Sequence, residues 1–280
     1  MSAMELLKDK KLQSGVRLKG LNSLKDGHAS VKDFSLTGEM PAWYLCQWNS
    51  KYNLKNGVFE IGDGKYSISD ESKIFTVYKN GDLEFELNAR REYAAARREC
   101  EPWPHLLIEQ EITENNRVKD MRSIVCSADF RLEKFKNYMG AEEREYHTAQ
   151  FVWVVTLKDD NPSSPSYNSF IWVVMCPFDS RYDYAPLSTM QDTALPDGEF
   201  IYSFCASDFI DKPMKSGETV KMRLDLYPHL GRMLQCAQNK GFMKGSRAED
   251  LVISSTNMGF EITGTFDCRV SVKNLDIHIG

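Results

Sequence analysis

Two glutamates separated by a single residue are the first groups in this chain that could do acid–base chemistry. They are Glu109 and Glu111 in "PHLLIEQEI" (104–112). In a β-strand successive side chains point to opposite faces, so the two carboxylates share one face and Gln110 lies on the other. Their Cα atoms would lie roughly 6.5–7 Å apart, and paired carboxyl groups can cleave glycosidic bonds as acid and nucleophile or base. The alternative is a solvent-facing strand surface that is simply acidic.

Gln110 and Gln150 are polar residues on faces that are otherwise aliphatic. Gln110 shares its face with Ile108, and Gln150 alternates with Val152 and Val154. A buried amide needs hydrogen-bond partners. Each glutamine therefore either caps a neighbouring segment inside the protein or binds a hydroxyl group of a ligand, and both are candidate ligand-binding residues.

Tryptophans supply candidate surfaces for stacking on a sugar ring. Trp43 lies in "PAWYLCQWNS" and Trp103 lies between two prolines in "EPWPH", both expected as loops, while Trp172 lies on an apolar strand. A flat aromatic ring buries much area at little entropic cost. The alternative is that these rings fold inward and close the ends of the protein.

The loop "CPFDSRYDYAP" (176–186) follows an apolar strand and is dense in functional groups, with Arg181 and Tyr184 as candidate binding residues. Such strand-end loops often carry binding residues, although an Asp–Arg pair could equally pin the loop. His147 or Tyr184 is a candidate base for a lyase, in which Arg181 or Gln110 would neutralise a uronate. A satisfied structural role is the alternative for His147.

Arginine occurs in two pairs within "NARREYAAARREC" (88–100). The guanidinium fork matches carboxylate or phosphate oxygens, which makes an anionic ligand conceivable. Because Glu92 and Glu99 are adjacent, the other interpretation is a solvated surface that pairs with itself.

The elements that must position these residues are mostly strands. Segments rich in β-branched and aromatic residues alternate with turn-like separators, and Asn80-Gly81 suggests a hairpin with a type I′ turn. Helical spacing appears in 228–240, bounded by Pro228 and Gly241. We expect an all-β chain, an antiparallel two-sheet β-sandwich or jelly roll, with one short helix. It would form a single domain over 1–280, on which an N-terminal extension (1–30) packs. The expected strands are 72–78, 82–88, 122–135, 147–157, 168–176, 199–207, 218–227, 250–262 and 265–279.

Two of these strands, 147–157 and 168–176, are apolar on both faces, which is typical of central strands covered on both sides. One cover is the opposing sheet. The other would be loops, a helix, a partner subunit or a ligand cleft, which is the first indication of a concave, partly apolar site.

Composition narrows the class of partner. The formal net charge is −5 over 280 residues, which does not favour a nucleic-acid partner. No apolar run suits a membrane span or a secretory signal. Seven widely spaced cysteines without a Cys-x-x-Cys pair predict reduced thiols and a cytoplasmic protein. No metal-ligand cluster, Gly-rich phosphate loop or other cofactor motif occurs, so no metal and no cofactor are expected.

The run "NMGFEITGTFDCRVSVKNLDIHIG" (257–280) resembles the last strands of concanavalin A-like lectin/glucanase jelly rolls, and "EPWPHLLIEQEI" (101–112) resembles a strand that crosses their concave sheet. The resemblance implies a curved two-sheet sandwich whose concave face handles glycans. Family 16 glucanases carry Glu-x-Asp-x-Glu on that strand, whereas "EQE" supplies only two acids. Catalytic roles are therefore not carried over.

These observations predict a carbohydrate-handling protein that binds an oligosaccharide or polysaccharide in the concave face of a β-sandwich, with a glycoside hydrolase as one candidate. The alternatives are a polysaccharide lyase and a non-catalytic structural or oligomerising sandwich. In the structural alternative a partner chain would bury the doubly apolar strands.

Overall fold

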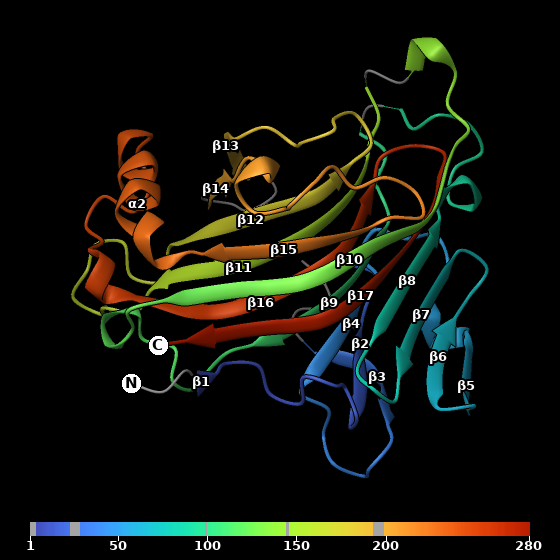
Figure 1. Ribbon diagram of the computed structural model, residues 1–280, viewed down its shortest axis with the longest axis horizontal. Helices are drawn as coiled ribbons and strands as arrows, with labels where there is room; N and C mark the ends of the chain where they lie inside the picture. The colour runs from blue at the N-terminus through green and yellow to red at the C-terminus, as the bar shows by residue number, and fades with distance from the viewer. Residues whose placement is uncertain (1–3, 23–28, 99, 144–145, 193–198) are drawn as a thin grey trace.

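A computed structural model describes residues 4–22, 29–98, 100–143, 146–192 and 199–280. Within these ranges the strands form two sheets that stack on one another, and β10 and β17 run as long ribbons through one of them (Figure 1). The predicted two-sheet β-sandwich is confirmed.

The eight-stranded sheet has the last strand of the chain near its middle. Its order is β15-β10-β17-β8-β7-β6-β5, and β1 also pairs with β17. The bounds are β15 Thr219–Asp225, β10 Ile124–Asn137, β17 Phe266–Ile279, β8 Leu83–Asn88, β7 Lys73–Tyr78, β6 Lys65–Ser69, β5 Val58–Gly62 and β1 Met4–Glu5.

The nine-stranded sheet carries the candidate site. Its order is β13-β14-β12-β11-β16-β9-β4-β2-β3. Among the described strands the pairings are antiparallel except β12 with β14 and β2 with β4. The bounds are β13 Ser188–Asp192, β14 Glu199–Ser203, β12 Phe170–Asp179, β11 Ala149–Asp159, β16 Leu251–Ile262, β9 His105–Glu111, β4 Trp43–Cys46, β2 Gly15–Lys19 and β3 Ser30–Ser35.

The core lies between the sheets, because one set of alternating side chains on each sheet is apolar. Phe151 of β11 packs against Phe85 and Phe130 of the eight-stranded sheet and against Phe260 of its own sheet, with ring centroids 5.0–5.7 Å apart. The side of the nine-stranded sheet that faces away from this core is called the outer face below.

The predicted helix is confirmed as α2 (Leu230–Asn239), which follows the 3-10 turn η6 (Tyr227–His229). Its buried residues sit at helical spacing, and it lies beside the strands at one end of the sandwich (Figure 1). The other 3-10 turns are η1 Leu54–Asn56, η2 Ala89–Arg91, η3 Val118–Asp120, η4 Ala141–Glu143, η5 Ala206–Asp208 and η7 Ala248–Asp250.

The structure differs from the predictions in the N-terminal part. Residues 1–30, expected as an extension packed on the sandwich, supply β1 to one sheet and β2 to the interior of the other. Strands β2 to β6, and β13, were not predicted. The β7–β8 hairpin is present, but its turn is not type I′. Gly81 alone has a positive φ, 95°, and its N–H donates to the Tyr78 carbonyl (2.8 Å), as in a type I turn followed by a bulge.

Candidate functional site

Strand β9 separates its polar residues between the two faces as predicted. His105, Glu109 and Glu111 lie on the outer face, and Gln110 points toward the core. The two glutamates therefore share a strand face on which Gln110 does not lie, and the third polar residue of this face on β9 is His105.

Gln110 and Trp43, both predicted as ligand-binding residues, are 1% exposed and hold the N-terminal segment instead. The Gln110 amide donates to the Lys8 carbonyl and accepts from the Lys8 N–H, both at 2.8 Å. The Trp43 indole N–H donates to the carbonyls of Lys8 and Asp9 at 3.0 Å. Trp43 is part of β4, not a loop. The expectation that these two residues face a ligand is corrected: their polar atoms are occupied inside the protein.

Glu109 forms an ion pair with Lys19 of β2 on the outer face. Their side chains are 12% and 3% exposed, and the Lys19 ammonium also lies 4.6 Å from the Tyr44 ring centre. Burial works against the charge of Lys19, but Glu109, together with Cys46 and Glu111, outweighs it, and the pKa of Lys19 is raised. Burial raises the pKa of the neighbouring Cys46 thiol well above its ordinary value, and the charge of Glu109 adds to this.

A row of polar side chains crosses four adjacent strands of the outer face. His105 of β9 pairs in register with Glu261 of β16, Glu261 with Gln150 of β11, and Gln150 with Asp179 of β12. The His105 Nε2 atom lies 3.8 Å from the Glu261 carboxylate. This row, here called the polar row, joins one predicted residue, Gln150, to three that were not among the predicted site residues.

Asp179 anchors one end of the polar row. Its carboxylate accepts hydrogen bonds from the Arg181 side chain (2.7 and 3.0 Å), from the Gln150 amide (2.7 Å) and from the Thr148 hydroxyl (3.0 Å). Burial alone would raise the pKa of the Asp179 carboxyl, but the hydrogen bonds from Arg181, with a smaller contribution from Gln150, lower it below its ordinary value. Arg181 therefore holds this loop in place through its ion pair with Asp179, which is the non-ligand interpretation that the sequence suggested for the segment.

Trp172 marks an apolar end of the outer face. It is half-buried, its ring centre lies 5.4 Å from that of Phe170, and it pairs in register with Thr156 on one side and Ile201 on the other. Ile201 in turn pairs with Met190, which is 56% exposed. The exposed aromatic residue Tyr184 lies in the loop after β12.

Trp103, the remaining predicted tryptophan, lies near the opposite end of the outer face, beside His105. The ring centres of Trp103 and Trp48 lie 5.8 and 5.9 Å from that of His105. The Arg97 guanidinium stacks over Trp103 at 5.1 Å. One predicted arginine is thus placed near the polar row.

The arginine segment does not pair with itself in the way that its sequence suggested. Arg90 pairs with Asp267, with 3.1 Å between nitrogen and oxygen, and Glu92 pairs with Lys73 at 3.3 Å. Glu99 lies outside the described residues.

His147 precedes β11 and is buried, and its Nδ1 atom has no hydrogen-bond partner among the described residues. The structure does not bring it together with Glu109 or Glu111, because Gln150, three residues later, pairs with Glu261 and not with either glutamate. A catalytic role for His147, Glu109 or Glu111 stays a prediction.

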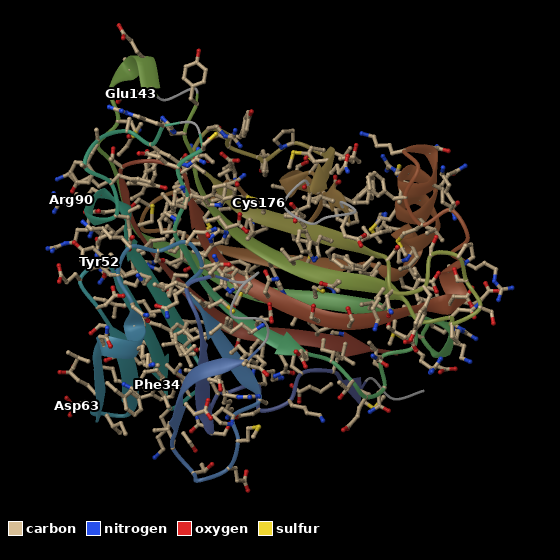
Figure 2. All side chains as sticks on the ribbon, turned by 180° about the vertical axis from the view of Figure 1, so that it is seen from behind. Phe34, Tyr52, Asp63, Arg90, Glu143 and Cys176 are labelled. Carbon is tan, nitrogen blue, oxygen red and sulfur yellow. The ribbon has the colours of Figure 1, made fainter. Side chains whose placement is uncertain are left out.

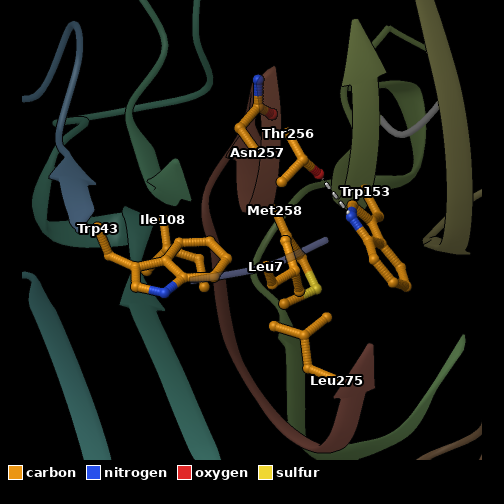
Figure 3. A pocket seen from close by; sticks show the side chains of 8 residues that line it. All are labelled: Leu7, Trp43, Ile108, Trp153, Thr256, Asn257, Met258 and Leu275. Atoms are coloured by element: carbon orange, nitrogen blue, oxygen red, sulfur yellow. Dashed lines mark hydrogen bonds between the residues drawn. The ribbon is translucent and has the colours of Figure 1, made fainter. Parts of the chain in front are cut away.

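Two hollows lie away from the polar row. One, between the sheets, has no room for a water molecule and is lined by Leu7, Trp43, Ile108, Trp153, Thr256, Asn257, Met258 and Leu275 (Figure 3). The Trp153 indole donates to the Thr256 hydroxyl there (2.9 Å). The other, about 140 Å³, lies between the N-terminal segment and the end of β9, and both Gln110 and Glu111 are among the residues that line it.

In the described part of the chain no three His, Cys, Asp or Glu side chains gather as metal ligands. The seven cysteines, all within the described ranges, are free. No helix of the described residues has the length and apolar character that crossing a membrane requires.

No family model matches the chain, and no curated protein matches it significantly. Solved structures similar to it include a family 12 xyloglucanase from Bacillus licheniformis (12% identity, 81% of this chain and 98% of that chain, TM-score 0.46). An endoglucanase from Rhodothermus marinus matches at 12% identity (80% and 98%, TM-score 0.42), and a family 11 xylanase from Neocallimastix patriciarum at 10% (80% and 96%, TM-score 0.44). These similarities are too distant to transfer a residue role.

Sequence reasoning did not select Lys19, His105, Glu261 and Asp179 as site residues. His105 could have been found, because it alternates with Glu109 and Glu111 on one strand face. Glu261 becomes its neighbour only through the pairing of β9 with β16, for which the sequence carries no local signal.

Proposed function

We propose that the outer face of the nine-stranded sheet binds an oligosaccharide. A sugar ring has apolar faces and hydroxyl groups at its edge, so a site for it needs an apolar platform beside hydrogen-bonding groups. The outer face offers both, and the half-exposed ring of Trp172 on a surface shared with polar side chains is the observation that carries the proposal.

The ring of Trp172, which is the apolar platform, lies in the same cross-strand row as polar side chains of neighbouring strands. One row across the sheet runs from Glu111 through Ser255 and Thr156 to Trp172. The neighbouring cross-strand row, two residues along each strand, contains Glu109, Asn257, Val154 and Val174.

The polar row lies further along β16, at Glu261. Ser255 and Glu261 are separated by about 20 Å along the strand at roughly 3.3 Å per residue. A ligand that contacts both Trp172 and Glu261 is therefore an extended chain of several sugar units, not a monosaccharide.

The test is calorimetric titration of the protein and of Trp172→Ala with neutral and charged oligosaccharides of several lengths. We expect longer chains to bind more tightly and Trp172→Ala to weaken binding about tenfold, the effect of losing one aromatic stacking partner. Tyr146→Ala is the matched control, because Tyr146 is an exposed aromatic residue that lies outside the strands of the nine-stranded sheet. It follows the turn η4, whose Glu143 is labelled in Figure 2.

Absence of binding across the panel, or equal binding by Trp172→Ala, would contradict the proposal. Product analysis of the bound oligosaccharide then separates binding from cleavage. Shortened products that disappear in Glu109→Gln or Glu111→Gln would support a glycoside hydrolase, and an unsaturated product would support a lyase.

A further inference from the structure

We propose that the polar row binds a free amino group of the glycan, so that the ligand belongs to the class of amino sugars. This inference rests on the proposed function and names the substrate class of the same face. Three hydrogen-bond acceptors from three adjacent strands carry it: His105 Nε2, the Glu261 carboxylate and Gln150 Oε1.

The hydrogen bonds of His105 fix which of its ring nitrogens is an acceptor. Nδ1 lies 3.2 Å from the Trp48 carbonyl oxygen. A carbonyl can only accept, so Nδ1 carries the proton, and in the neutral imidazole Nε2 is left with a lone pair. The Nε2 atom lies 3.8 Å from a Glu261 carboxylate oxygen, so in this neutral form of the ring two acceptors face one another. Two acceptors this close without a hydrogen between them are satisfied by a donor that both can share.

Glu261 is the carboxylate of the polar row that no strong cation neutralises. Asp179, at the other end, is held by Arg181, and Glu109 of the same face is held by Lys19. Among the described residues no lysine or arginine pairs with Glu261, whose side chain is 34% exposed. Its charge is therefore available to a ligand.

Gln150 presents its carbonyl oxygen beside Glu261. Its amide nitrogen donates to Asp179 at 2.7 Å, which fixes the orientation of the side chain. No donor in the described part of the chain is hydrogen-bonded to Oε1. The row thus presents acceptors next to one another, on strands that are about 4.8 Å apart.

An ammonium group matches this arrangement better than other sugar substituents do. It has three N–H donors and a positive charge, whereas a hydroxyl has one donor and no charge. A uronate or sulfate would be repelled by Glu261. The Trp48 ring beside His105 adds an aromatic surface of the kind that attracts cations, and the Lys19 ammonium already lies 5.8 Å from its centre.

The experiment compares three β-1,4-linked oligosaccharides of equal length: one of glucosamine, its N-acetylated counterpart and one of glucose. Acetylation removes the charge and two of the three donors without changing the chain. We expect the glucosamine oligomer to bind at least about tenfold more tightly than the other two, as one charge-assisted hydrogen bond would give. Glu261→Gln, which keeps the shape of the side chain, should abolish that preference. Glu60→Gln, an exposed glutamate on β5 of the other sheet, should retain it.

The outcomes separate this inference from the proposed function. Equal binding of all three oligomers, lost in Trp172→Ala, would overturn the amine site and leave oligosaccharide binding standing. A preference for glucosamine that persists in Glu261→Gln would place the amine elsewhere and also overturn it. Absence of binding for all three oligomers would contradict both the amine site and the proposed oligosaccharide binding. Thermal unfolding of each variant shows that a loss of binding does not reflect a loss of folding.

Discussion

The ammonium group of Lys19 on β2 reaches across β4 to the carboxylate of Glu109 on β9, and both groups are almost fully removed from solvent. Burying either charge without its partner would lower the stability of the fold, because the loss of hydration would not be compensated. Each residue therefore offsets the cost of burying the other. The ion pair consequently fixes the orientation of the Glu109 side chain, in contrast to Glu111, which lies exposed two residues further along the same strand.

Replacement of Lys19 by methionine should leave Glu109 as an uncompensated buried charge. We expect Lys19→Met to lower the free energy of unfolding by about 3 kcal/mol, and the double variant Lys19→Met/Glu109→Gln to recover part of that loss because it removes the second charge as well. Urea unfolding of the four proteins measures the coupling. Lys8→Met is the control, since its pair with Glu114 is exposed and should contribute less than about 1 kcal/mol. Additive effects of the two changes would show that the pair is not coupled.

Asp179 predicts how stability changes in acid. Its pKa is lowered in the folded protein, so its ionised form stabilises the fold above the ordinary value of 3.8, and this contribution is lost as the pH falls through the folded-state pKa. We expect Asp179→Asn to be less stable by about 2 kcal/mol at neutral pH, the effect of weakening charge-assisted hydrogen bonds. The difference from the unchanged protein should shrink as the pH falls below 3.8, which denaturant unfolding at a series of pH values tests. A difference that stays constant with pH would assign the effect to shape and not to charge.

Gln110 should matter for stability and for the order of the N-terminal segment. Gln110→Ala removes both hydrogen bonds to the Lys8 backbone and should lower the free energy of unfolding by about 2 kcal/mol. Amide hydrogen exchange at residues 6–9 should become faster. Gln150→Ala is the comparison, because Gln150 lies on the outer face and should leave that exchange unchanged. Unchanged protection of residues 6–9 in Gln110→Ala would mean that the β1–β17 pairing and the Trp43 hydrogen bonds hold the segment without Gln110.

Gly259 lies on the outer face between Leu107 and Val152, and no other residue fits there. Its φ is 153°, and an added Cβ would lie 2.0 Å from the Leu106 carbonyl oxygen. Gly259→Ala should therefore destabilise the fold by about 3 kcal/mol or more, because β9 and β16 would have to separate. Gly62→Ala, where nothing lies within 4 Å, should be neutral or slightly stabilising. Similar melting temperatures for the two variants would contradict this explanation.

Most strands from β7 onward, with β13 as an exception, were predictable because the alternation of their residues reflects which side is buried. In β8, for example, Leu83, Phe85 and Leu87 are buried and the residues between them are not. The N-terminal strands lack this signal. Strand β2 carries Arg17 and Lys19 on its outer face, and β5 exposes Val58 and Ile61. Their strand conformation is imposed by pairing with neighbours, not by local propensity.

For the candidate site, the sequence predicted which residues share a face of one strand, but not which strands lie next to one another. The opposite orientations of Glu109 and Gln110 follow from the geometry of one strand, and the structure shows the two side chains on opposite faces of β9. The partners that decide their roles lie far away in the chain: Lys19 is 90 residues from Glu109, and Lys8 is 102 residues from Gln110. Such contacts depend on the order of strands in a sheet, which alternation does not encode.

The positions of β16 and β17 also govern when the protein can form during synthesis. Each is an interior strand of its sheet, with β16 between β11 and β9 and β17 between β10 and β8. Until residues 251–279 have left the ribosome, the earlier strands have unpaired edges and an open core, and they are exposed to association with other chains. Since the decisive pairings join residues more than a hundred positions apart, folding should be slow and should not be completed before β16 and β17 have emerged. A nascent chain that lacks these two strands is therefore the species for which a cell would need a chaperone.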